Sequence, residues 1–220
     1  MKTFFYDVDT QNDFINPDGA LYIKGAELLK PNLKALTDYA IKNKIMILGS
    51  VDKHFGTDDY QYIETELSKW GGFFPDHCIS QCYGQKKIAE TIVSNSLFVD
   101  SAQKQQYNVS DLLKYEQIMF EKQSYDVFFS PYNLGGNKNI FNIIRDLSEN
   151  QVVNIIVYGV ATDYCVKAAT LDLLKHGVQV YVVKDAIKAV NVNQNDEYQS
   201  ITEMLNAGAI FRNTNDILTQ

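Results

Sequence analysis

The sequence contains few of the residues that mark cross-linked, disordered or repetitive chains. It has three cysteines, four prolines and twelve glycines among 220 residues. This composition excludes collagen-like, low-complexity and disordered classes. Three is an odd number of cysteines, and a chain of this length does not need cross-links to be stable. We therefore expect at least one free thiol rather than a disulfide framework.

Long apolar runs and clusters of positive charge are also absent. The most apolar stretch, residues 155–161, is far shorter than the roughly 20 residues that span a bilayer. Acidic residues outnumber basic ones by 27 to 20, and no basic cluster of five or more occurs. No signal-peptide apolar region develops after Met1. We therefore expect a cytoplasmic protein that binds neither membranes nor nucleic acid.

Short β-rich runs alternate with helical patterns along the chain. Hydrophobic residues make up 45% of the sequence, enough for a substantial core, and the length predicts a single domain over residues 1–220. Runs rich in Ile, Val, Phe and Tyr predict strands over Lys2–Asp9, Lys44–Asp52, Leu97–Asp100, Gln117–Lys122, Gln151–Val160 and Val178–Asp185. The segments between them predict helices over Ala26–Lys42, Gln85–Val93, Asn137–Asn150, Asp163–Lys175 and Asn195–Ala207.

This alternation predicts an α/β fold with three αβα layers, in which helices cover both faces of a mostly parallel, Rossmann-like sheet. The one long irregular region, about 55–84, is too aromatic to be disordered, and we expect it to be an elaborated loop of the same domain. Ligands of such sheets bind beyond the carboxyl ends of the strands. Residues that follow predicted strands are therefore the first candidates for a functional site.

Four strand ends carry residues that can do chemistry: Asp9, the Asp52-x-His54 pair, Lys122 and Cys165. Cys165 falls at the start of a predicted helix, where backbone N–H groups and the helix dipole favour a thiolate. A nearby lysine would lower the thiol pKa further, and a nearby aspartate could take the proton. The set is that of a cysteine nucleophile with a base and a cation.

Each of these residues, taken alone, also has an ordinary structural interpretation. An aspartate at a strand end often forms a turn or a cap, and a single cysteine in a buried helix is commonly a small apolar filler. Lys122 by itself would be a solvated surface lysine. His176, next to Gly177, is expected to be an exposed helix-end residue, and we assign it no role.

Asp52-x-His54, followed at a distance by His77, is compatible with a divalent metal ion held by one carboxylate and two imidazoles. The alternative is a structural zinc cluster of His77, Cys78 and Cys82. The gap of three residues between these cysteines differs from the usual two, and there is no second thiol pair.

Three motifs together resemble one known family. Residues 9–14, Asp-Thr-Gln-Asn-Asp-Phe, resemble the opening motif of the isochorismatase-like cysteine hydrolases. Residues 159–166, Gly-Val-Ala-Thr-Asp-Tyr-Cys-Val, look like their nucleophile segment, and residues 122–128 are similar to their lysine segment. Asp52-x-His54 and the Phe-Pro-Asp-His-Cys run at 74–78 resemble the metal site of the nicotinamidase and pyrazinamidase branch. The resemblance extends over essentially the whole chain.

The resemblance implies roles for individual residues. Its catalytic triad corresponds to Asp9, Lys122 and Cys165, and its backbone oxyanion donors to Ala161 and Cys165. Its metal ligands correspond to Asp52, His54 and His77, and the aromatic residues that sandwich the substrate ring to Phe14 and Phe74. The Val160–Ala161 peptide corresponds to a bond that is cis in this family.

The sequence departs from the resembled pattern in two places. Many nicotinamidases have a further histidine ligand shortly after the Asp-x-His pair, where this chain offers only the carboxylates of Asp58 and Asp59. A Gly-Thr-x-Gly run usually follows the His-Cys pair, whereas residues 81–84 are Gln-Cys-Tyr-Gly. Water, Asp58 or Asp59 could complete the ligand set.

The resemblance implies a cytoplasmic cysteine amidohydrolase that acts on a small aromatic carboxamide. Nicotinamide is the expected substrate, converted to nicotinate and ammonia through a thioester on Cys165, as in NAD salvage and pyridine nucleotide biosynthesis. The expected cofactor is one divalent metal ion, zinc first, with manganese or iron as alternatives. Two other readings stay open: a hydrolase of another amide, carbamoyl or ureido substrate, and a non-catalytic binding relative. A homo-oligomer is expected by resemblance only.

Overall fold

The computed structural model describes residues 1–220 except 101–107, 129–139, 150 and 220. In this part of the chain seven strands form one sheet in the order β3-β4-β2-β1-β5-β6-β7, and every neighbouring pair is parallel. This confirms the predicted α/β fold with a parallel sheet. The strands are β1 (Lys2–Val8), β2 (Ile47–Asp52), β3 (Ser96–Val99), β4 (Gln117–Lys122), β5 (Val153–Val160), β6 (Gln179–Lys188) and β7 (Ile210–Arg212).

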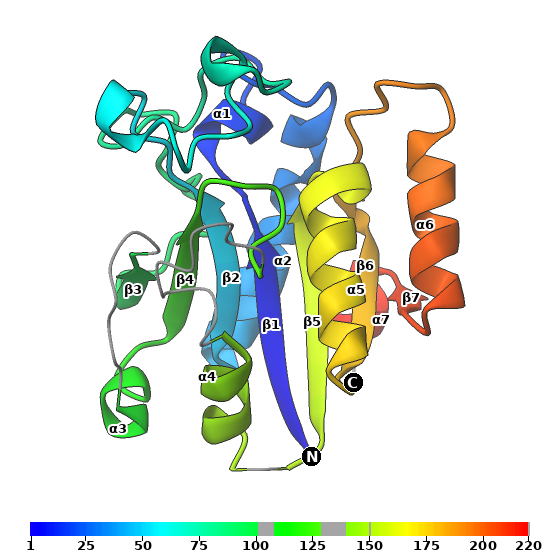
Figure 1. The fold of residues 1–220 in the computed structure, drawn as a ribbon. Coiled ribbons are helices and arrows are strands. Elements are labelled where there is room, and N and C mark those ends of the chain that lie inside the picture. The colour runs from blue at the N-terminus through cyan, green and yellow to red at the C-terminus, as the bar shows by residue number, and fades with distance from the viewer. Residues whose placement is uncertain (101–107, 129–139, 150, 220) are drawn as a thin grey trace.

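Helices cover both faces of the sheet, which gives the three predicted layers (Figure 1). Helices α4, α5 and α6 contribute to the core on one face, and α2 and α7 to the core on the other. None of the helices in the described part of the chain is both long enough and apolar enough to cross a membrane. The helices are α1 (Asn12–Ile15), α2 (Lys30–Lys42), α3 (Val109–Leu112), α4 (Ile140–Leu147), α5 (Lys167–Lys175), α6 (Asp196–Asn206) and α7 (Thr214–Leu218).

The central strand β1 shows why the sheet needs cover on both sides. Phe4, Tyr6 and Val8 belong to the core beneath α4 and α5, while Phe5 belongs to the core beneath α2. Side chains of a strand alternate between the two faces of a sheet, and a strand that is apolar at successive positions must therefore bury both faces. The same alternation places Asp7 among the apolar residues on the α2 side.

The helix predicted over Gln85–Val93 is wrong, because the backbone of this segment pairs with the link between β1 and α1 instead. Gln11 and Lys87 form a β-bridge, and the Ile88 N–H donates to the carbonyl of Thr10 (3.0 Å). The Lys87 ammonium is buried 2.8 Å from the Asp7 carboxylate. A helical pattern cannot reveal this ion pair, since its partner lies 80 residues earlier.

Other differences concern the ends of elements. The helix predicted over Ala26–Lys42 is a 3₁₀ turn (Ala26–Leu29) followed by α2, which has Pro31 in its first turn. The helix predicted from Asp163 begins as a π-helical turn (Thr162–Val166), and α5 follows it. In the helix predicted over 137–150, α4 accounts for the middle, and residues 137–139 and 150 lie outside the described residues. Four short elements, α1, α3, β7 and α7, were not predicted.

The position of β1 between β2 and β5 determines where a ligand can bind. The chain proceeds from β1 to β2 on one side, and β5 adds on the other, so a crevice opens at the carboxyl ends of these strands. The long connection from β2 to β3 passes over this edge (Figure 1). Its regular parts are two 3₁₀ turns, Asp58–Tyr60 and Ser68–Trp70.

Candidate active site

Four adjacent strands bring the predicted triad together. Asp9 follows β1 with a left-handed backbone (φ 50°), and Lys122 ends β4 beside its register partner Asp52 on β2. Cys165 lies in the π-helical turn after β5. The order β4-β2-β1-β5 therefore gathers residues that are up to 156 positions apart at one edge of the sheet (165 − 9 = 156).

Lys122 is at the centre of this arrangement. Its Nζ lies 2.9 Å from Asp9 Oδ2 and 3.5 Å from Cys165 Sγ, and it forms a second ion pair with Asp52. The side chain is 1% exposed, which rules out the interpretation as a solvated surface lysine. Burial by itself would lower the pKa of Lys122, but the charges of Asp52 and Asp9 hold that pKa well above its usual value. Lys122 is therefore a fixed cation.

The expected low pKa of Cys165 is not what the structure shows. Burial raises the pKa of the Cys165 thiol well above its usual value, although the nearby Lys122 charge lowers it. Burial also raises the pKa of Asp9, again against the effect of Lys122, and the Ser50 hydroxyl donates to Asp9 Oδ1 at 2.7 Å. The lysine and the helix start are visible in the sequence, whereas the loss of water around the thiol follows from the fold. Burial therefore acts against the charged forms of both Cys165 and Asp9, and Lys122 acts in their favour.

The backbone before Cys165 has the form that the resemblance implies. The Val160–Ala161 peptide is cis, and Ala161 and Cys165 line the same pocket. Between Ala161 and Cys165, the Asp163 carboxylate accepts hydrogen bonds from the N–H groups of Val190 (3.0 Å) and Asn191 (2.8 Å). Because Val190 also lines the pocket, Asp163 connects the π-helical turn to another part of the pocket wall.

Asp52, His54 and His77 form a buried cluster whose ligand atoms all lie within 4.8 Å of one another. His54 Nδ1 faces Glu64 Oε2 at 3.2 Å, and His77 Nδ1 faces the Pro75 carbonyl oxygen at 2.7 Å. Because both Nδ1 atoms face acceptors, we assign the ring protons to Nδ1, which leaves a lone pair on each Nε2.

The orientation of these imidazoles fits a divalent ion. His54 Nε2 is buried with no hydrogen-bond partner among the described residues, and His77 Nε2 lies 3.4 Å from Asp52 Oδ2. A buried nitrogen without a partner is costly, and coordination of a metal ion would satisfy it. Metal-bound histidines usually donate their other N–H to a carboxylate or a carbonyl, as both do here.

Glu64 and Glu66 are the site residues that the sequence analysis missed. Both are buried, Glu64 against His54 and Glu66 in the wall of the pocket. Asp58 and Asp59, which with water were the alternatives for a further metal ligand, are exposed and are not part of the cluster. The available signal was that the two glutamates lie between the apolar residues Ile63 and Leu67, which are also buried.

The alternative zinc cluster with cysteines is not formed. Cys78 is buried, Cys82 is exposed, and all three cysteines of the chain are free thiols. Neither Cys78 nor Cys82 belongs to the metal-type cluster found among the described residues, although Cys78 is adjacent to His77. The cluster uses carboxylate and imidazole ligands only.

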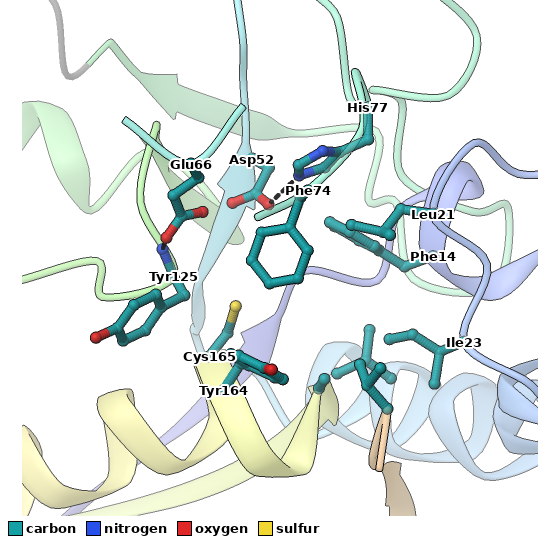
Figure 2. Close-up of a pocket in the computed structure, with 13 residues that line it drawn as sticks. Phe14, Leu21, Ile23, Asp52, Glu66, Phe74, His77, Tyr125, Tyr164 and Cys165 are labelled. Atoms are coloured by element: carbon teal, nitrogen blue, oxygen red, sulfur yellow. Dashed lines mark hydrogen bonds and ion pairs between the residues drawn. The ribbon is translucent and has the colours of Figure 1, made fainter. Parts of the chain in front are cut away.

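A pocket next to the cluster has aromatic walls and contains about 390 Å³ of space, part of it open to solvent. Figure 2 shows the Cys165 sulfur pointing into this space toward Phe74, with Phe14 on the far side. Phe74 meets Tyr164 edge-on, with ring centres 5.5 Å apart, and Phe14 is 5.5 Å from His77. Both predicted substrate-contacting aromatics therefore line the pocket.

Gly84 is the one position at which residues 81–84 agree with the resembled Gly-Thr-x-Gly run, and the structure shows why it is glycine. The Asp13 carboxylate accepts hydrogen bonds from the N–H groups of Ala20 (2.9 Å) and Cys78 (2.6 Å), and a Cβ on residue 84 would collide with that carboxylate. The position after Tyr83 thus needs glycine, although the residues before it differ from the usual run. Asp13 in this way holds the backbone next to His77.

The chain matches known proteins over nearly its full length. An isochorismatase domain model matches residues 7–216. The nicotinamidase of Escherichia coli strain K12 is 26% identical over 212 residues, which cover 92% of this chain and 90% of that protein. The nicotinamidase of Saccharomyces cerevisiae is 23% identical over 210 residues, which cover 87% and 89%.

A solved structure has the same fold. The zinc complex of the pyrazinamidase of Pyrococcus horikoshii superposes with a TM-score of 0.72 at 22% identity, covering 97% of this chain and 99% of that one. The parallel sheet agrees with this likeness, and the family model spans all four strand ends of the site. The chain therefore belongs to the isochorismatase family.

Proposed function

We propose that this amide-hydrolysing member of the family converts nicotinamide to nicotinate and ammonia through a thioester on Cys165. One observation carries the proposal: a buried lysine joins Asp9, Asp52 and the Cys165 sulfur at the base of an aromatic pocket beside a metal-type cluster. The curated relatives in bacteria and yeast are nicotinamidases, which supports this substrate.

Asp9 acts as the base of the first step. It takes the thiol proton as the Cys165 sulfur forms a bond to the amide carbon, so no stable thiolate is needed beforehand. Lys122 stays protonated and compensates the negative charge that moves between sulfur and carboxylate. The backbone N–H groups of Ala161 and Cys165 are the proposed donors to the oxyanion, each worth about 3–4 kcal/mol in comparable acyl-transfer sites.

The second half returns the enzyme to its starting state. Asp9 gives its proton to the leaving nitrogen as the C–N bond breaks, which releases ammonia and leaves a thioester. Asp9 then takes a proton from water as the water oxygen attacks the thioester carbon. As the C–S bond breaks, Asp9 gives this proton to the sulfur, which releases the acid and restores the thiol. Every proton transfer in this scheme uses the Asp9 carboxylate, so the rate depends on the groups that set the pKa of Asp9.

Asp52, His54 and His77 would hold the metal ion. When bound, a divalent ion supplies a Lewis acid that can bind the ring nitrogen of the substrate or a water molecule. One carboxylate and two imidazoles suit zinc, with manganese and iron as alternatives. Asp52 then has two functions, because its other oxygen pairs with Lys122.

The test is ammonia release from a panel of amides, measured with and without chelator. We expect nicotinamide to be hydrolysed fastest and the chelated enzyme to be slower. Faster turnover of a carbamoyl or ureido compound, with no effect of the chelator, would favour another branch of the family. Absence of turnover on every amide by metal-loaded protein would contradict the proposal. The nicotinate formed would enter NAD salvage.

A further inference from the structure

Glu66 places a carboxylate in the wall of a pocket that is otherwise mainly aromatic and apolar. The residue is 9% exposed, and its Oε1 accepts a hydrogen bond from the backbone N–H of Tyr125 at 2.5 Å. Among the described residues no other hydrogen bond reaches this carboxylate. Figure 2 shows Glu66 between Tyr125 and Asp52, facing the same space as the Cys165 sulfur. The mechanism proposed for Asp9, Lys122 and Cys165 does not involve this side chain.

Among the described residues, no lysine or arginine in the pocket wall balances Glu66 or binds an acidic substrate, so positive charge at the wall would come from the metal ion proposed at Asp52, His54 and His77. The lining of the pocket, within the described part of the chain, contains Asp52 and Glu66 but neither arginine nor lysine. The whole sequence has two arginines, Arg145 and Arg212, and both are exposed, on α4 and β7. Arginine is the side chain that binds carboxylates with two hydrogen bonds, so this pocket lacks the usual group for anchoring an anion.

The cation beneath the pocket is already engaged. Lys122 is paired with both Asp9 and Asp52. The charge of Glu66 also reaches the nucleophile, because it contributes to raising the pKa of Cys165. Burial raises the pKa of Glu66 above its usual value, and the nearby Lys122 charge lowers it. When Glu66 is ionised, a carboxylate formed at the position of the amide would lie in the field of its negative charge. Charges of like sign repel strongly where water is excluded.

We propose that Glu66 is a specificity-determining residue, which makes the pocket favour uncharged amides over carboxylates. It thereby excludes anionic substrates and speeds the release of the acid product. This inference rests on the proposed function, since the acid is the product only if the enzyme hydrolyses a carboxamide. Glu66 is not assigned a bond to the metal or to the reacting atoms.

Replacement of one oxygen by nitrogen isolates the charge of Glu66. Glu66→Gln keeps an acceptor for the Tyr125 N–H, so a purely structural role would be preserved. The matched control is Glu121→Gln, because Glu121 is also a buried carboxylate but pairs with Lys53 outside the pocket. Both changes are made in zinc-loaded Cys165→Ala protein, in which bound amide is not consumed.

Calorimetry then measures the dissociation constants of nicotinamide and nicotinate, with benzamide and benzoate as a second pair. We expect Glu66→Gln to tighten acid binding relative to amide binding on the order of tenfold, as expected for removal of one nearby charge. Glu121→Gln should leave the ratio unchanged. When Glu66→Gln is made in protein that keeps Cys165, added nicotinate should inhibit ammonia release more strongly than it inhibits the wild type, by the same factor. The zinc content of this variant should equal that of the wild type.

The outcomes separate this inference from the proposed function. An unchanged ratio of acid to amide binding in Glu66→Gln would overturn the role of Glu66, whatever the turnover. A loss of zinc in Glu66→Gln would also overturn it, since Glu66 would then act through the metal. Absence of ammonia release by the wild type would overturn the proposed function, whereas the benzamide and benzoate constants would still measure the effect of the charge.

Discussion

Lys122 illustrates how much a single residue depends on its surroundings. In the sequence it is one of 20 basic residues, yet in the fold it is almost fully buried, with two carboxylates and a thiol around its ammonium group. A buried charge persists only when opposite charges compensate its loss of hydration. The pairs with Asp9 and Asp52 supply this compensation, and the same geometry places the ammonium group next to the Cys165 sulfur.

Cys165→Ala should reduce ammonia release to the background level, because the thiol is the only group proposed to bond covalently to the substrate. Cys82→Ala is the control, since Cys82 is an exposed free thiol. Its rate should equal that of the wild type. Thermal unfolding shows whether each variant is folded. Retention of more than a few per cent of the rate in folded Cys165→Ala would rule out the thioester route.

Lys122→Met should raise the pKa of Cys165 still further, because it removes the positive charge that lowers this pKa. The midpoint of alkylation rate against pH should move upward. The change should also cost about 3–5 kcal/mol of stability, since it leaves two buried carboxylates without their partner. An unchanged alkylation midpoint in folded protein would mean that the ammonium group does not act on the thiol.

Substitutions around the cluster of Asp52, His54 and His77 should distinguish residues that bind the metal ion from residues that only orient its ligands. Wild-type protein should bind about one divalent ion, as expected for three ligands with open positions, and His54→Ala should lose it. Glu64→Gln should weaken binding by about 10–100-fold, because Glu64 orients His54 through Nδ1. Asp59→Ala should have no effect, since Asp59 is exposed.

Elemental analysis after incubation with zinc, manganese or iron measures these occupancies. Protein that stays metal-free in all three would leave Asp52, His54 and His77 as a packing feature. A loss in Asp59→Ala equal to that in His54→Ala would instead show that an exposed carboxylate moves into the site.

At the scale of elements, the loop connections over the sheet edge depend on one carboxylate. Asp13 is the second residue of α1. Its carboxylate accepts hydrogen bonds from the backbone N–H groups of Ala20 and Cys78, which lie in two other loops. Gly84 packs directly against this carboxylate. Such bonds between a side chain and the backbone replace the regular backbone hydrogen bonds that loops lack. They fix the backbone next to His77, whose ring lies beside Asp52.

Gly84→Ala should therefore lower both stability and metal content, because its Cβ would displace the Asp13 carboxylate and loosen the backbone next to His77. Gly71→Ala is the comparison. Gly71 also lies in this connection, and its Cβ would meet no atom within 4 Å, so only its left-handed backbone (φ 92°) opposes the change. That strain costs about 1–2 kcal/mol. Unfolding midpoints and zinc content are the measurements, and equal zinc retention in both variants would contradict the role of Asp13.

At the scale of the whole molecule, several buried groups keep their protons to high pH. Burial raises the pKa of Tyr6 and Tyr158 and the pKa of the Cys78 and Cys165 thiols. The unfolded chain loses these protons near pH 8.5 for Cys and about 10 for Tyr, whereas the folded chain retains them. The folded state then binds more protons than the unfolded state, so its stability must fall as pH rises.

The free energy of unfolding should accordingly decline from about pH 9 upward, by about 1.4 kcal/mol per pH unit for each such group. Tyr158→Phe removes one of these groups and should make the decline shallower. Denaturant midpoints between pH 8 and 11 provide the measurement. Identical slopes for wild type and Tyr158→Phe would show that this tyrosine titrates normally in the folded state.

The local pattern of the chain was enough to predict the α/β fold and the residues at four strand ends. Buried parallel strands are short and continuously apolar, and polar residues that follow them must lie at the carboxyl edge of the sheet. Asp9, Lys122 and Cys165 follow from this rule together with the resemblance. The rule depends only on residue type and order along the chain.

The tertiary structure decided what depends on distant partners and on exclusion of water. The raised pKa of Cys165, the buried pair of Lys87 with Asp7 in place of a helix, and the approach of Glu64 to His54 and of Glu66 to the pocket all belong to this class. The cost of burying a charge and its compensation by a partner are set by distances across the fold. The number of residues between two positions in the sequence does not determine the distance between their side chains in the fold.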